Sequence, residues 1–317
     1  MKYRTIQGVL EPVSELCFGT MRYADSEGRE DQRSSTGARA LEAAIEHGVN
    51  FIHSSYEYGT RWLTGRLLKA HRKRMSLQHI IKVNVPDWEE PRFSASAFRA
   101  QVETALAELG TEQIAVVQHL QRGVSRKQIL NGEGDAHRLS QFDEVTTELA
   151  EISTTLRREG KIGTVMSFPY TSAYAKKAVE SPVYSGIVTY FNLLETEMFQ
   201  FFSRLRELEK DVVAIRPLAG GVLTSRRIDR DTLPEHDRMR DSSADELYRR
   251  LGQIMPVVGT PQIPWEQYAY RFTLADPLVK STVLGINSIH HLATAASEID
   301  LPQGLVQQIF QRSKYIF

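Results

Sequence analysis

Short apolar runs alternate with helix-like segments along this chain, and this alternation limits its fold more than any other feature. The runs are rich in Val, Ile and Phe and lie at 15–19, 49–53, 79–85, 114–120, 162–168, 186–191, 212–218 and 281–286. They are almost continuously apolar, as is typical of parallel strands that are buried on both faces. Eight strand–helix units in 317 residues predict a single (β/α)8 TIM barrel.

The segments between the runs have the spacing of amphipathic helices. Segment 37–48 places four apolar residues in one stripe before Gly48. Segments 94–110 and 142–160 each begin at a residue suited to capping and end at a glycine. A doubly wound open sheet is the alternative, but it needs a G-x-G-x-x-G turn after the first strand, and the chain has none there.

Two segments are longer than ordinary loops. Residues 121–140 and 224–260 contain no strand-like run, and loops of this length usually act as lids or binding loops. We therefore expect both at the C-terminal face of one barrel domain spanning residues 1–317. The charge-rich stretch 226–246 within the second segment is interpreted as a solvated face.

Composition excludes several classes of function. Lys plus Arg and Asp plus Glu each number 39, so net charge indicates neither nucleic acid nor a membrane surface as partner. The single cysteine, Cys17, rules out an internal disulfide and a Cys-based zinc cluster, and we assign no metal site. The N-terminus lacks a signal-peptide core and no apolar run is long enough to span a membrane, so we expect a soluble cytoplasmic protein.

Polar side chains gather at the expected strand ends, where barrel enzymes keep their active sites. These residues are His53, Ser54, Tyr58, Lys82, Gln118, His119, Ser167 and Arg216. Lys82 interrupts an apolar strand, so its amine needs an acceptor, an anion or the loss of its proton. A lysine beside a tyrosine hydroxyl lowers the pKa of that hydroxyl, and Tyr58 could supply one. An ion-paired lysine and a packing tyrosine are the simpler alternatives.

The motifs around these residues resemble the aldo-keto reductase superfamily, nearly from end to end. "GVNFIHSSYEYG" is similar to the family's G-x-N-F-x-D-T-A-x-x-Y-G, "IIKV" to the strand with the family lysine, and "EGKIGTVMSF" to E-G-K-I-R-x-x-G-x-S-N. "VVAIRPLAGGVLTS" resembles the segment that embraces the cofactor pyrophosphate, and the N-terminal stretch resembles the family's β-hairpin and first strand. The resemblance implies a TIM barrel, the cofactor NADP(H) and reduction of carbonyl compounds.

The same resemblance implies the site residues. Tyr58 and Lys82 fall on the catalytic tyrosine and lysine, whereas His53 stands where the family has aspartate. His119 lies one residue before the family histidine, so it should face the helices unless a bulge corrects it. The cofactor-binding positions that remain are Gly19, Thr20, Leu218, Gly221 and Leu223, and we also assign Arg216 and Asn287 to the cofactor site.

Most side chains that hold the nicotinamide and adenine in the family are replaced in this chain. The replaced positions carry Phe168-Pro169, Val188, Ile215, Arg216 and Thr294-Ala295. Three hypotheses remain open: an atypical NADP(H)-dependent carbonyl reductase with weak cofactor binding, a non-redox enzyme on the same barrel, or a non-catalytic binding protein. We also expect His53, Tyr58 and Lys82 to form one hydrogen-bonded cluster that prefers an anionic small-molecule ligand.

Overall fold

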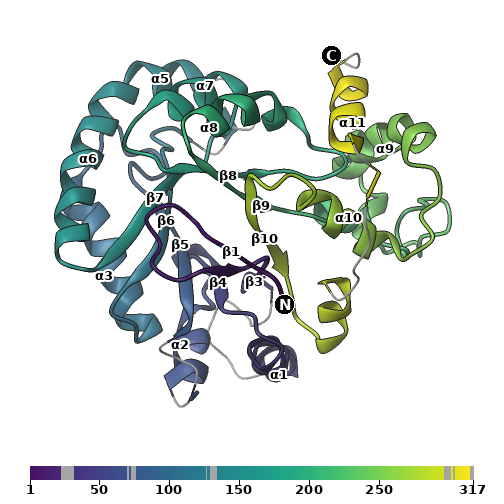
Figure 1. Ribbon diagram of the computed structural model, residues 1–317, viewed down its shortest axis with the longest axis horizontal. Coiled ribbons are helices and arrows are strands. Elements are labelled where there is room, and N and C mark those ends of the chain that lie inside the picture. Colours follow the sequence, from purple (N-terminus) through teal and green to yellow (C-terminus); the bar gives the residue numbers. More distant parts are fainter. Residues whose placement is uncertain are drawn as a thin grey trace.

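The computed structural model contains a closed barrel of eight parallel strands, with helices on its outside (Figure 1). It describes residues 1–22, 32–69, 71–72, 76–125, 127–128, 134–295, 301–302 and 304–314. The strands follow one another around the barrel in chain order, and β10 closes it by pairing with both β9 and β3. The (β/α)8 prediction is therefore confirmed, and all eight predicted apolar runs correspond to barrel strands.

The elements have the following bounds. The strands are β1 (Tyr3–Arg4), β2 (Val13–Ser14), β3 (Leu16–Gly19), β4 (Phe51–Ser54), β5 (Gln78–Asn84), β6 (Ile114–Leu120), β7 (Ile162–Ser167), β8 (Gly186–Tyr190), β9 (Asp211–Ile215) and β10 (Val279–Gly285). The α-helices are α1 (Gln32–Glu46), α2 (Arg61–Lys69), α3 (Ala95–Leu109), α5 (Asp135–Ser140), α6 (Phe142–Arg158), α7 (Ser172–Glu180), α8 (Phe202–Glu207), α9 (Asp245–Val258), α10 (Trp265–Thr273) and α11 (Leu305–Lys314). Short 3-10 helices are η1 (Tyr56–Tyr58), η3 (Glu197–Phe201), η4 (Ala219–Gly221), η5 (Arg238–Arg240), η6 (Ser242–Ala244) and η7 (Ile289–Ala295).

The strands bury side chains on both faces, which explains their continuous apolar sequences. Inside the barrel, Phe51, Val116 and Val213 belong to one buried cluster. Their strand neighbours face outward: Ile52 and Val117, for example, pack in the clusters between the barrel and the helices. Because successive residues of a strand point to opposite faces, the same strands build both layers.

The N-terminal hairpin closes the bottom of the barrel. β1 and β2 pair antiparallel, and the turn between them places Ile6 and Val9 in the interior barrel cluster. The Gln7 amide donates to Asp211 at the start of β9, at 2.7 Å. Because the hairpin contacts the strand beginnings, it leaves the C-terminal ends of the strands free for a functional site, and Figure 1 shows it (purple) crossing the barrel.

Local signals explain most helix ends. The Ser94 side chain accepts from the amide of Ala97, and Gly110 ends α3 in the left-handed conformation. The capping expectation is wrong at the start of α6, where Gln141 makes no side-chain capping bond. No helix in the described part of the chain is long and apolar enough to span a bilayer.

The second long segment is more ordered than its sequence suggested. Residues 224–260 contain η5, η6 and the 14-residue helix α9, so describing the segment as a loop was wrong. Asp237 is largely buried and pairs with Arg227 at 2.9 Å, so part of the charged stretch is internally neutralised rather than solvated. Of the first long segment, residues 126 and 129–133 lie outside the described part, and α5 forms its end.

Candidate functional site

Three predicted residues come together at the C-terminal mouth of the barrel. Tyr58 lies in η1, directly after β4, and the Nζ atom of Lys82 on β5 lies 4.9 Å from the centre of its ring. The rings of His53 and Tyr58 are 5.9 Å apart. His53 Nε2 donates to Gln118 Oε1 on β6, at 2.9 Å. The expected hydrogen bonds among His53, Tyr58 and Lys82 are therefore not found: cation–π and ring contacts hold these residues together, and His53 bonds to Gln118 instead.

Burial dominates the protonation of these groups. It lowers the pKa of His53 to about 3, with a further contribution from the charge of Lys82. It also lowers the pKa of Lys82 to about 8, against the opposing effect of the Glu57 carboxylate. Burial raises the pKa of Tyr58, so the expected lowering of the tyrosine pKa by the lysine is not found. At neutral pH His53 is neutral and Tyr58 is a protonated hydroxyl.

Arg122, which was not predicted from the sequence, forms ion pairs with the two carboxylates that could otherwise neutralise Lys82. Its guanidinium forms paired hydrogen bonds with Glu57 at 2.7 and 2.8 Å and contacts Asp87 at 3.0 Å. It also lies 4.0 Å from the ring centre of Trp88. Consequently no carboxylate of the described residues lies within 4.0 Å of Lys82. A basic residue directly after a barrel strand was the signal that could have revealed Arg122.

His119 faces the helices, as its one-residue offset predicted. Its ring nitrogens lie 2.8 Å from the Tyr184 hydroxyl and 2.7 Å from the Val85 carbonyl oxygen. Phe93 and Phe98 pack against its edge. His119 is therefore a buried structural residue and does not reach the mouth cluster.

We expect His119→Phe to lower the free energy of unfolding by about 2–4 kcal/mol, because it removes two buried hydrogen bonds, including the one to the Val85 carbonyl oxygen. Urea unfolding measures this change. Tyr184→Phe, which removes only one of the two bonds, should cost about half as much. A His119→Phe protein as stable as the wild type would contradict the structural role.

Gly19 and Thr20 lie at the end of β3 and contact the backbone of the neighbouring strands. Neither presents a free side chain to a ligand. The Thr20 hydroxyl and amide both donate to the His53 carbonyl oxygen, at 3.0 and 3.2 Å. A Cβ on Gly19 would lie 3.0 Å from the Leu284 carbonyl oxygen. Thr20 therefore ties β3 to β4 beside the mouth cluster, and Gly19 lets β3 lie close to β10.

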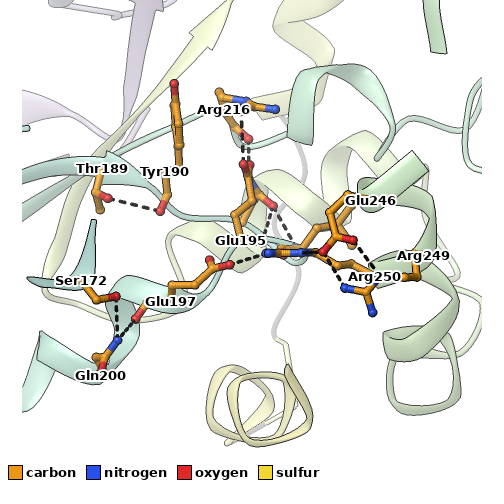
Figure 2. Close-up of polar contacts among 12 residues, drawn as sticks. Ser172, Thr189, Tyr190, Glu195, Glu197, Gln200, Arg216, Glu246, Arg249 and Arg250 are labelled. Carbon is orange, nitrogen blue, oxygen red and sulfur yellow. Dashed lines mark hydrogen bonds and ion pairs between the residues drawn. The ribbon is translucent and has the colours of Figure 1, made fainter. Parts of the chain in front are cut away.

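Arg216 does not add a free positive charge to the mouth. Its guanidinium pairs with Glu195 at 3.3 Å and lies 4.7 Å from the ring centre of Tyr190, as Figure 2 shows. Tyr190, which was not predicted, ends β8 and is partly exposed. Its position two residues after Val188, on the same strand face, was the available signal.

Arginines surround the turn that follows β9. The turn, residues 216–223, has positive φ at Arg216, Ala219, Gly220 and Gly221 and includes the predicted positions Leu218 and Leu223. A Cβ on Gly221 would lie 2.8 Å from Arg227 Nη1 and 3.7 Å from Arg238 Nη2. The pKa of Arg238 is lowered by burial and by the charges of neighbouring arginines, chiefly Arg22 and Arg227. This turn is suited to an anion.

The predicted nicotinamide-binding positions beside the turn are packed against other apolar side chains. Phe168 packs edge-on against Tyr190, with ring centres 5.5 Å apart, and Val188 belongs to the buried barrel interior. Asn287 follows β10 at the same end of the barrel and is partly exposed.

A cavity of about 350 Å³ lies next to Tyr190, between the end of β7 and α9. In the wall of this cavity, Arg250 of α9 bonds to Glu246 on the same helix and to Glu197 on η3 (Figure 2). The charged groups of this wall are therefore paired with one another, and the cavity opens beside Phe168 and Tyr190 rather than against His53, Tyr58 or Lys82.

Comparison with known proteins agrees with this architecture. The structure is similar to an aldo-keto reductase, AKR11C1 from Bacillus halodurans in its holo form, with TM-score 0.73 and 19% identity over 98% of this chain and 96% of that one. It is also similar to the glycerol dehydrogenase AKR11B4 from Gluconobacter oxydans, with TM-score 0.69 and 17% identity over 99% and 95% of the two chains. No curated protein sequence matches significantly. Because the profile of the Aldo/keto reductase family matches residues 15–311, the chain belongs to the aldo/keto reductase family.

Proposed function

We propose that this protein is an atypical NADP(H)-dependent carbonyl reductase that binds its cofactor weakly. The observation that carries the proposal is the contact of Tyr58 with Lys82 at the barrel mouth, 4.9 Å from Nζ to ring centre. Burial raises the pKa of Tyr58 and so keeps its hydroxyl protonated at neutral pH, which leaves it a proton to donate to a carbonyl oxygen. The Lys82 amine beside it would stabilise negative charge that develops on that oxygen.

The residues present fit one end of NADP(H) and not the other. Arg238, beside residues 216–223, suits its phosphates, since guanidinium groups bind phosphate oxygens well. Arg216 and Arg227 are already paired with Glu195 and Asp237. The nicotinamide end is different, because Phe168, Val188 and Ile215 have no side-chain hydrogen-bonding group. When bound, NADP(H) supplies the hydride. Tyr58 and Lys82 hold the carbonyl group and supply the proton to its oxygen. The cavity beside Tyr190 gives space for the remainder of the carbonyl compound.

We expect NADPH to bind with a dissociation constant well above the low micromolar range. Roughly three or four hydrogen bonds to the nicotinamide side are missing, at about 1 kcal/mol each, which weakens binding by several hundredfold or more. Isothermal titration calorimetry at two ionic strengths measures the affinity, which should fall as salt rises. Low-micromolar binding would contradict the weak-binding proposal.

A pair of variants tests where the phosphates bind. Arg238→Gln should weaken NADPH binding by about tenfold, because it removes a charge beside the Gly221 turn. Arg240→Gln is the matched control: Arg240 lies on the same short helix, but it donates to the Leu233 carbonyl oxygen, whereas Arg238 donates to the Gly220 carbonyl oxygen within the turn. Equal affinities for the two variants would show that the turn does not hold the cofactor.

A second candidate is a non-redox enzyme that uses Tyr58, Lys82 and His53 on an anionic ligand. It is favoured by the absence of any carboxylate within 4.0 Å of Lys82 among the described residues. The buried Nε2 atom of Gln118 also has no hydrogen-bond partner in that part of the chain, so it could donate to a ligand oxygen. Phosphate or a carboxylate that binds the wild type but not Lys82→Met, with no NADPH oxidation, would favour this candidate.

A further inference from the structure

We propose that Lys82 captures small aldehydes as an imine, so that the barrel mouth has a covalent carbonyl-binding activity that requires no cofactor. The inference rests on the proposed function in one respect: carbonyl compounds must enter the mouth. It assigns Lys82 the role of a nucleophile, in addition to its electrostatic role beside Tyr58.

The geometry sets Lys82 apart from an ordinary ion-paired lysine. Its side chain is largely buried near the C-terminal end of β5, and its Nζ atom lies over the Tyr58 ring. The neighbouring acids Glu57 and Asp87 are engaged by Arg122, at 2.7 and 3.0 Å. A desolvated amine without a bound carboxylate is the arrangement that activates a lysine as a nucleophile.

The charged and titratable groups around Lys82 come from three elements. His53 on β4 is neutral, Glu57 on η1 favours the ammonium form, and Arg122 after β6 disfavours it. Burial has the largest effect and lowers the pKa of Lys82 to about 8. About a tenth of the amine is therefore neutral at pH 7, against less than about a thousandth for a lysine with an ordinary pKa.

The capture step is balanced without an oxidant or reductant. The lone pair of the neutral Nζ attacks the aldehyde carbon, and an Nζ proton passes to the carbonyl oxygen. The carbinolamine oxygen then takes a second proton from the Tyr58 hydroxyl and leaves as water, and the C=N bond forms. The proton remaining on nitrogen returns to Tyr58, so the net products are an imine and one water molecule.

Borohydride trapping tests the proposal. The protein is incubated with acetaldehyde without NADPH, reduced with sodium borohydride and digested, and ethylation of each lysine is measured by mass spectrometry. We expect Lys82 to be modified at least about tenfold faster than the exposed Lys176. The rate for Lys82 should reach half its maximum near pH 8. Modification of Lys82 no faster than Lys176 overturns the proposal.

Two variants of His53 separate charge from shape. His53→Asp places a carboxylate on the strand next to Lys82, which should favour the ammonium form and reduce trapping at least about tenfold. His53→Asn has nearly the shape of His53→Asp without its charge, so it should be trapped at least about tenfold faster than His53→Asp. Equal trapping in the two variants overturns the proposal, and the pH profile of the wild type tests it even if either variant fails to fold.

The two proposals fail independently. NADPH oxidation with acetaldehyde is measured in a separate assay on the same preparation. Fast trapping of Lys82 without NADPH oxidation supports the imine and contradicts the reductase. NADPH oxidation without trapping supports the reductase and overturns the imine.

Discussion

Lowering the pH from 6.5 to 4 is expected to unfold this protein, because three buried histidines must remain neutral in the folded state. Burial lowers the pKa of His53 to about 3 and those of His79 and His119 to about 4. In the unfolded chain each takes up a proton near pH 6.5. Their contribution to stability is thus complete above pH 6.5 and is lost as the pH falls toward the folded values.

The expected loss is large compared with the total stability of a protein. Each histidine contributes about 1.4 kcal/mol per pH unit, or about 3 kcal/mol between pH 6.5 and 4, so three contribute about 9 kcal/mol. Typical folded proteins are stable by only about 5–15 kcal/mol. Carboxylates that are paired in the folded state act mainly at lower pH, since their unfolded pKa lies near 4.

Urea unfolding between pH 7 and 4.5 measures the free energy of unfolding at each pH. Its slope against pH should approach the value expected for three protons taken up on unfolding. His79→Leu should remove about one proton from this slope, because the buried Nδ1 of His79 has no partner among the described residues. His236→Gln replaces an exposed histidine and should leave the slope unchanged. A slope below one proton in the wild type would show that the histidines titrate alike in the folded and unfolded states.

The second large effect concerns catalysis: Tyr58→Phe should lower kcat for carbonyl reduction by about 10²–10⁴-fold, the usual contribution of a positioned general acid. The phenyl ring keeps the contacts of Tyr58 with Lys82 and His53, so the fold and NADPH affinity should change little. Steady-state kinetics with a panel of aldehydes, together with calorimetry, measures both. Full activity of Tyr58→Phe would mean that Tyr58 only packs in the mouth.

Lys82→Met distinguishes a functional lysine from a purely structural one, because its activity and its stability should change in opposite directions. The variant should lose activity and become more stable, because the folded state keeps the pKa of Lys82 near 8 at a cost of about 3 kcal/mol at neutral pH. Thermal unfolding measures the stability, and functional residues often show this opposition between stability and activity. A Lys82→Met protein that is less stable than the wild type would indicate that Lys82 has a bound acid after all.

The sequence determined the barrel because burial on both faces leaves a readable pattern. Eight continuously apolar runs predicted the eight strands, and β6 spans the predicted residues, Ile114–Leu120. The alternation of faces along a strand also predicted that His119 points outward, which its bonds to Tyr184 and Val85 confirm. These features depend on local periodicity, which is present in the order of the residues.

The electrostatic character of the mouth was decided only by the tertiary structure. Nothing in the sequence shows that Arg122 lies between Glu57 and Asp87, or that Arg216 pairs with Glu195 rather than adding its charge to the mouth. The helix α9 and its Arg250 contacts were likewise hidden in a segment interpreted as a loop. Ion pairs between residues far apart in sequence depend on where the barrel places each strand end, and desolvation depends on what then covers them. The sequence therefore determined which residues stand at the mouth, and the packing decided which of them remain charged.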